Sequence, residues 1–176
     1  MDFWIQAGTP RSSGRHDPAA SGLDEVIETV FPLETEDALI VWKATPVPLS
    51  YKYDLSVMME DLLDLLDSLL GESSGEYSLT WPSNTFRAEW KVRWEDQRLT
   101  IEADWQSVVG GTEQVLNAAG RLDVSVKQFV AEWKRPLELI EDAIRSCGYS
   151  VDVLPDIERI QRVVRKIPGS GYLYRA

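Results

Sequence analysis

Hydrophobic and polar residues alternate most regularly between residues 86 and 105. Apolar side chains occupy every second position on both sides of Asp96-Gln97, which predicts two half-buried strands joined by a two-residue turn. The predicted cross-strand pairs are Trp94–Leu99, Val92–Ile101, Trp90–Ala103, Ala88–Trp105, Glu95–Arg98 and Lys91–Glu102. Large residues meet small ones on one face and opposite charges meet on the other, so both faces specify the same register. The apolar face, with its three tryptophans, is expected in the core.

A helical period is clearest from residue 56 to residue 70. Leucines and methionines recur there every three or four positions and form one broad apolar stripe. At 100° per residue, Glu60, Asp64 and Asp67 fall together on the opposite side. Gly71 suits the left-handed position at which a helix stops.

The remaining pattern is typical of an α+β protein. Further helices are predicted near residues 23–30, 126–147 and 156–167, and Pro136 should kink or split the second of these. Short strands are predicted over residues 3–5, 38–44, 47–55, 77–81 and 149–153. Residues 8–22 predict a loop, and residues 108–120 predict a loop with one helical turn. We therefore expect a single α+β domain over residues 1–176, in which helices pack on a mostly antiparallel sheet.

The acidic charge is concentrated in one segment of the chain. The 176 residues contain 29 Asp and Glu against 18 Lys and Arg, a formal net charge of −11. Nearly half of these acids lie in residues 22–77, where Lys43 and Lys52 are the only basic residues, whereas the rest of the chain is balanced. An excess this negative argues against nucleic acids and anionic membranes as partners. It favours a positively charged partner.

The carboxylates of helix 56–70 are the predicted partner-binding residues. No Lys or Arg lies at the spacing that would pair with them on the same helix, and like charges at this spacing weaken an isolated helix. The predicted site consists of Glu60, Asp64, Asp67, Glu72 and Glu76. The basic residues of the last predicted helix, between residues 156 and 167, partly complement the acidic segment.

The sequence carries no recognisable catalytic, cofactor or metal site. His16 and Cys147 are the only residues of their kinds and stand far apart, which excludes the usual zinc site and any intramolecular disulfide. Neither a nucleophile elbow nor a phosphate-binding glycine motif is present. We therefore expect no enzymatic activity and no cofactor. Residues 1–10 lack a secretory pattern and no apolar run spans a bilayer, so a cytoplasmic location is expected.

Two alternatives remain open. The predicted outer face of the hairpin places Glu89 opposite Asp104 with Glu102 beside them, and three carboxylates can hold Mg²⁺. A small metal-dependent enzyme is therefore one alternative, and a ligand-binding regulatory module is another.

The chain resembles the immunity proteins of bacterial polymorphic toxin systems, which accompany type VI secretion and contact-dependent inhibition effectors. The resemblance rests on the Trp-rich hairpin 86–105, the acidic helix face from Glu60 to Asp67 and the length of the chain. It implies a cytosolic protein that binds one cognate toxin and neutralises it. Many such toxins are nucleases with basic clefts, so an acidic surface would compete with substrate, but the chemistry of the target stays open.

Overall fold

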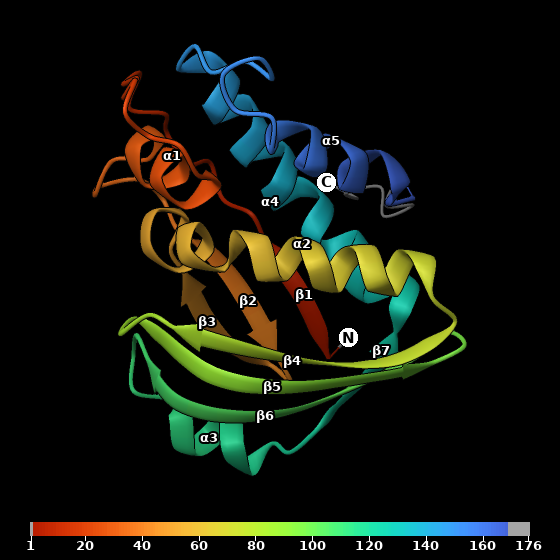
Figure 1. Cartoon of the computed structure of the whole chain (residues 1–176). Helices are drawn as coiled ribbons and strands as arrows, with labels where there is room; N and C mark the ends of the chain where they lie inside the picture. The colour runs from red at the N-terminus through yellow and green to blue at the C-terminus, as the bar shows by residue number, and fades with distance from the viewer. Residues whose placement is uncertain (1, 169–176) are drawn as a thin grey trace, which may run out of the picture.

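Two antiparallel sheets form the framework of the protein, and helices pack against both of them (Figure 1). The computed structural model describes residues 2–168. The first sheet has the strand order β1-β2-β3, with β1 at Phe3–Gln6, β2 at Ala38–Trp42 and β3 at Thr45–Leu49. The second has the order β4-β5-β6-β7, with β4 at Ser74–Pro82, β5 at Phe86–Glu95, β6 at Arg98–Val108 and β7 at Leu122–Ser125. The expected α+β class is confirmed.

The hairpin of β5 and β6 has the predicted register. Trp90 lies opposite Ala103, Lys91 lies opposite Glu102, and the other four predicted pairs are also formed. Asp96 takes a left-handed conformation in the turn, with φ at 53°, as a tight two-residue hairpin requires. Side-chain pairing on two faces was therefore enough to fix this register from the sequence.

A cluster of aromatic rings joins the two sheets. Trp42 of β2 lies 5.3 Å from Trp90 and 5.3 Å from Trp105, measured between ring centroids. Trp81 of β4 extends the cluster, with its ring centroid 5.2 Å from that of Trp90. Phe86 lies next to it, 4.7 Å from Trp81. All five side chains are buried, so the tryptophans form core, as the alternating pattern predicted.

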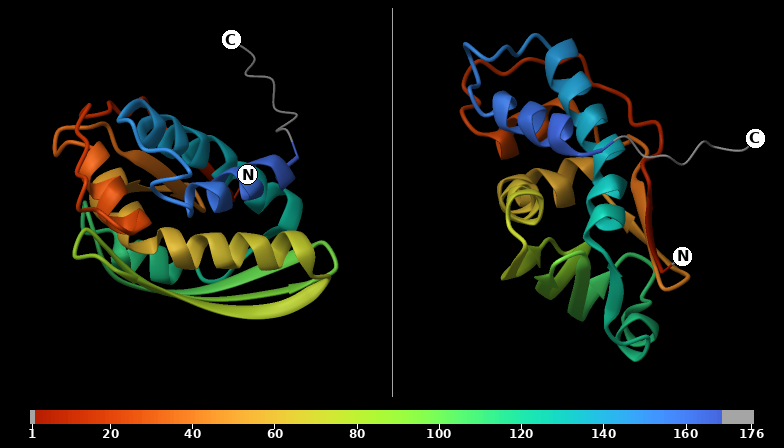
Figure 2. Two further views of the ribbon diagram at one scale, coloured as in Figure 1. Left: turned by 45° about the horizontal axis from the view of Figure 1, so that its top comes forward. Right: turned by 90° about the vertical axis from the view of Figure 1, so that its right-hand side faces the viewer.

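Five helices complete the described part of the fold (Figure 2). They are α1 at Leu23–Val30, α2 at Ser56–Gly71, α3 at Glu113–Ala118, α4 at Val126–Ser146 and α5 at Ile157–Lys166. Helix α4 continues through Pro136, so the predicted split does not occur. Pro136 is buried with Trp133 and Leu137, and this packing offsets the backbone hydrogen bond that proline cannot make. No helix within residues 2–168 has the length and apolar composition needed to cross a bilayer.

Three local expectations are corrected. The predicted strand 47–55 ends at Leu49, because residues 51–55 form a π-helical turn that leads into α2. Ser50 caps this turn by accepting a hydrogen bond from the Tyr53 N–H, and the Asp54 carboxylate accepts one from the Ser50 N–H. Residues 149–153 do not form a strand, because residues 151–153 form a turn in which the Leu154 N–H is bonded to the Ser150 carbonyl. Strand β7 was not predicted, and its residues were left unassigned before the predicted helix 126–147.

Candidate partner-binding surface

Three of the five predicted partner-binding residues face α5. The Arg159 guanidinium forms ion pairs with both Glu60 and Asp64. One turn further along α2, each carboxylate oxygen of Asp67 contacts a different cation of α5. Oδ2 lies 3.2 Å from Arg162 Nη2, and Oδ1 lies 3.0 Å from Lys166 Nζ. The acidic face of α2 and the basic face of α5 therefore neutralise each other within the chain.

The other two predicted residues lie beyond the end of α2. The carboxylate of Glu76 on β4 approaches Arg93 Nε at 3.6 Å, and both side chains are largely exposed. Glu72 caps the C-terminus of α2, and its backbone carbonyl accepts a hydrogen bond of 3.1 Å from Trp94 Nε1. Its carboxylate has no ion-pair partner within residues 2–168, so it remains available to a partner molecule.

Opposite pKa shifts mark the two ends of the α2–α5 contact. Burial raises the pKa of Glu60, Arg159 lowers it in part, and the carboxylates of Asp156, Asp64 and Asp24 raise it further. Burial also raises the pKa of Asp67, but the hydrogen bonds and charges of its two cations outweigh burial and leave this pKa below its usual value. The contact is thus electrostatically favourable at Asp67 and crowded with negative charge at Glu60.

Replacing Asp67 by asparagine is expected to destabilise the fold near neutral pH by about 0.5–1 kcal/mol, the size of a partly exposed ion pair. A folded-state pKa below the unfolded value of 3.8 means that ionised Asp67 stabilises the fold above that pH. The contribution disappears as the pH falls through the folded-state pKa. Urea unfolding of both proteins at pH 7 and pH 3 measures the difference, and an equal difference at both pH values would contradict it.

Four carboxylates carried by α1, by α2 and by the residue that follows α2 form no ion pair within residues 2–168. We call them the acidic face, and they are Asp24 and Glu28 of α1, Asp61 of α2, and Glu72. Asp24 is close enough to raise the pKa of Glu60, and Asp61 raises the pKa of Tyr77 on β4. Lys52 forms no ion pair with these carboxylates, but its ammonium group donates to the backbone carbonyls of Glu28 and Phe31, so its positive charge lies beside Glu28. The elements that carry the four residues are neighbours, because α1 packs on α2 and α2 leads into β4 (Figure 1).

Sequence reasoning selected only one member of the acidic face. The four-residue spacing of Asp24 and Glu28 on the predicted helix 23–30 was a usable signal, because it places both carboxylates on one exposed side. Asp61 is the residue next to Glu60, the first member of the acidic stripe predicted on helix 56–70. Which carboxylates lack a partner depends on where α5 packs, and helix periodicity does not contain that information.

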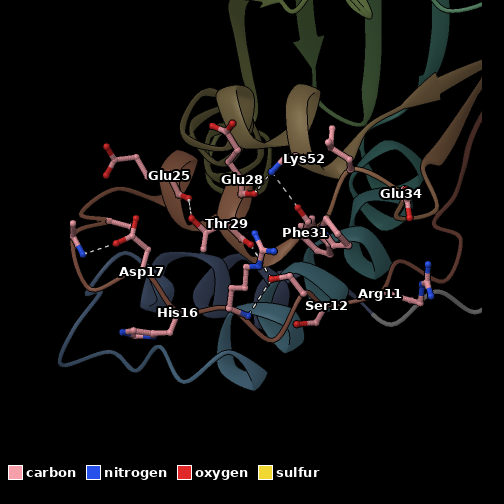
Figure 3. A pocket seen from close by; sticks show the side chains of 16 residues that line it. Arg11, Ser12, His16, Asp17, Glu25, Glu28, Thr29, Phe31, Glu34 and Lys52 are labelled. Carbon is pink, nitrogen blue, oxygen red and sulfur yellow. Dashed lines mark hydrogen bonds between the residues drawn. The ribbon is translucent and has the colours of Figure 1, made fainter.

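A groove of about 1230 Å³ adjoins the acidic face where the loop of residues 11–20 passes α1 (Figure 3). Its wall carries charged groups of both signs, which are Arg11, Arg15, Asp17, Glu25, Glu28, Glu34 and Lys52. Glu28 thus belongs to the groove and to the acidic face. Mixed charges of this kind provide no concentrated binding site for one small ion, and they suit contact with a polar protein surface.

The single histidine holds the loop in place. Nδ1 of His16 lies 3.1 Å from the backbone carbonyl of Cys147, and its ring stacks on Tyr149 with centroids 4.2 Å apart. The Tyr149 hydroxyl also meets the backbone of Asp17. Within residues 2–168 no serine or carboxylate side chain is hydrogen-bonded to His16, so its contacts are those of a structural residue.

The outer face of the hairpin does not assemble the proposed metal site. Glu89 lies opposite Asp104, as predicted, and Glu102 is on the same face. Within the described residues, however, no three His, Cys, Asp or Glu side chains are placed to share a metal ion. Of the three carboxylates, Glu102 lies opposite the basic Lys91.

Comparisons of the chain with protein families, with curated proteins and with solved structures find no match.

Proposed function

We propose that the protein is a cytoplasmic immunity protein, which binds a cognate basic toxin and neutralises it through the acidic face. The observation that carries the proposal is that Asp24, Glu28, Asp61 and Glu72, on the neighbouring helices α1 and α2 and just after α2, form no ion pair within residues 2–168. A chain selected only for stability would mix charges there, because unpaired like charges repel. A partner that supplies Lys or Arg side chains removes this repulsion on binding.

Negative potential over the acidic face also affects the rate of association. Complementary charges steer two proteins together and raise the association rate most at low ionic strength. For a nuclease target, the same carboxylates would occupy the cations that bind the phosphates of its substrate. For a target of another chemistry, they would provide orientation and speed, and inhibition would come from covering the active site.

The test uses the product of the gene adjacent to the one that encodes this chain. Expressed alone, that product should arrest bacterial growth, and co-expression of this chain should restore it. Changing Asp24→Asn, Glu28→Gln, Asp61→Asn and Glu72→Gln together should abolish protection and slow association of the purified proteins by at least tenfold at low salt. The matched control removes the same charge from the outer sheet face, with Glu89→Gln, Glu95→Gln, Glu102→Gln and Asp104→Asn, and should protect like the original protein.

Two results would contradict the proposal. Protection that survives neutralisation of the acidic face would remove this surface from the function. An adjacent gene product that is harmless, or that does not bind the purified chain, would argue against a toxin partner altogether.

A further inference from the structure

The edge of the first sheet at β1 is closed by side chains of α4. Glu132 Oε2 accepts a hydrogen bond of 2.9 Å from the Ile5 N–H, and Gln128 Nε2 donates one of 3.1 Å to the Phe3 carbonyl. These contacts satisfy backbone groups on the side of β1 that faces away from β2. The opposite edge, at β3, carries Pro46 and Pro48, which have no N–H to offer to another strand.

The β6 side of the second sheet is closed as well. Strand β7 covers only residues 98–101 of β6, and α3 covers the part beyond. The Asn117 amide bonds both the N–H and the carbonyl of Trp105 at 2.9 Å, in the manner of a neighbouring peptide group. Glu113 Oε1 accepts a hydrogen bond of 2.7 Å from the Val108 N–H. Strand β7 itself is only four residues long and leads directly into α4.

Strand β4, at the other edge of the second sheet, has no covering segment in the described part of the chain. It is nine residues long and pairs with β5 along its whole length, from Ser74–Glu95 to Pro82–Arg87. On its other edge, no strand, backbone group or side chain within residues 2–168 is hydrogen-bonded to it. Alternate residues of an antiparallel edge strand direct their N–H and carbonyl groups outward. The residues of β4 that discourage strand addition are Pro82, at its last position, and the charged Glu76 near its start.

An open edge of this length promotes strand addition, and proteins normally block it with charge, proline or a covering segment. This chain closes its edges at β1, β3 and β6 in these ways, whereas β4 has no covering segment among the described residues and carries neither charge nor proline from Tyr77 to Trp81. The outward side chains near the middle of β4 are small and polar, with Ser78 and Thr80 both exposed. They leave room for an approaching backbone.

We infer that β4 is a docking strand, onto which an extended basic segment of a protein partner adds as a further strand of the second sheet. The charge around the edge selects this occupant. Asp61 lies near Tyr77 of β4 and Glu72 just precedes the strand, and neither forms an ion pair within residues 2–168, whereas Glu76 on the strand itself has an exposed contact of 3.6 Å with Arg93 of β5. Backbone hydrogen bonds would provide affinity, and Lys or Arg at alternate positions would meet these carboxylates.

Charge repulsion disfavours a second copy of the chain as the partner that adds to β4. Pairing β4 with β4 would bring the same three carboxylates of each copy towards one another, and each copy carries a net charge of −11. The repulsion opposes a symmetric dimer through this edge. The inference rests on the proposed function for the basic nature of the partner, and it adds that the partner must present a strand.

The test measures amide hydrogen exchange and chemical shifts of the ¹⁵N-labelled full chain with two ten-residue peptides. In one peptide Lys alternates with Val, and in the other Glu replaces Lys. The lysine peptide should slow exchange at alternate amides of β4 and shift resonances of β4 and β5, whereas the glutamate peptide should do neither. Thr80→Lys should weaken binding of the lysine peptide at least fivefold, and Gln106→Lys, an equal charge change on β6 of the same sheet, should weaken it less than twofold.

The inference is overturned if the lysine peptide fails to bind, if its shifts fall on α1 or α2 without β4, or if both peptides bind alike. Protection of β4 that grows with protein concentration in the absence of peptide would show a dimer instead, and would also overturn it. Because no toxin enters this experiment, a negative result removes the docking strand alone. The proposed function is decided separately by the growth assay.

Discussion

Replacing Trp90 by alanine is expected to lower the free energy of unfolding by about 3–5 kcal/mol, the range for removing a large aromatic side chain from a core. Trp90 is 0% exposed and lies within 6.3 Å of four other aromatic rings, which are Trp42, Trp81, Phe86 and Trp105. Its removal leaves a cavity at the point where the two sheets meet. Urea unfolding followed by circular dichroism measures the change, and domains of this kind have only about 5–15 kcal/mol to lose.

Two matched variants separate packing from other effects. Trp90→Phe keeps an aromatic ring and removes an indole N–H that has no hydrogen-bond partner within residues 2–168, so it should cost clearly less than alanine. Lys91→Ala changes the next residue on the exposed face and should stay within about 0.5 kcal/mol of the original protein. A Trp90→Ala protein as stable as Lys91→Ala would show that the cluster does not hold the sheets together.

Replacing Asp54 by alanine is expected to cost about 2–4 kcal/mol, because two buried hydrogen bonds to a carboxylate are lost and their donors are left unpaired. Asp54 is 1% exposed. Oδ2 accepts from the Ser50 N–H at 2.7 Å, and Oδ1 accepts from the Thr85 hydroxyl at 2.6 Å. The side chain thereby ties the end of β3 to the turn between β4 and β5.

The matched change Asp54→Asn retains one carbonyl oxygen, so it should lose less stability than alanine. Thr85→Val removes the second hydrogen bond together with the contact between the Thr85 and Ser83 hydroxyls, and keeps the bond to the Ser50 N–H, so it should cost about 1 kcal/mol. Thermal and urea unfolding at pH 7 rank the three variants. If all three variants are as stable as the original protein, the hydrogen bonds of Asp54 do not contribute to the stability of the fold.

Local patterns in the sequence predicted the elements that depend on neighbouring residues. The hairpin register followed from paired side chains on β5 and β6, and the helices followed from their apolar period. The turn at Tyr51–Leu55 was misassigned, because its tyrosines alternate with Lys52 and Asp54 as in a strand. There the Ser50 and Asp54 cap determined the conformation, and alternation alone does not reveal a cap.

The candidate site was predicted less completely, for a physical reason. The acidic stripe of α2 was correctly identified as a charged helix face, but its neutralisation by Arg159, Arg162 and Lys166 depends on a contact between residues about one hundred positions apart. The open edge of β4 was equally inaccessible, because an edge is defined by the strands and side chains that fail to reach it. Such features require the packed structure.

The burial of Cys147 makes it a natural reporter of motion. It is the only cysteine of the chain and is 5% exposed, with its sulfur 3.0 Å from the Ser12 hydroxyl of the loop that borders the groove. Because the loop covers this thiol, we expect a thiol reagent to react with it fastest when the loop moves away from the end of α4. The alkylation rate of Cys147 is therefore expected to report the opening of this loop without any engineered label. A partner bound over the groove should lower that rate in proportion to the fraction of protein that it occupies.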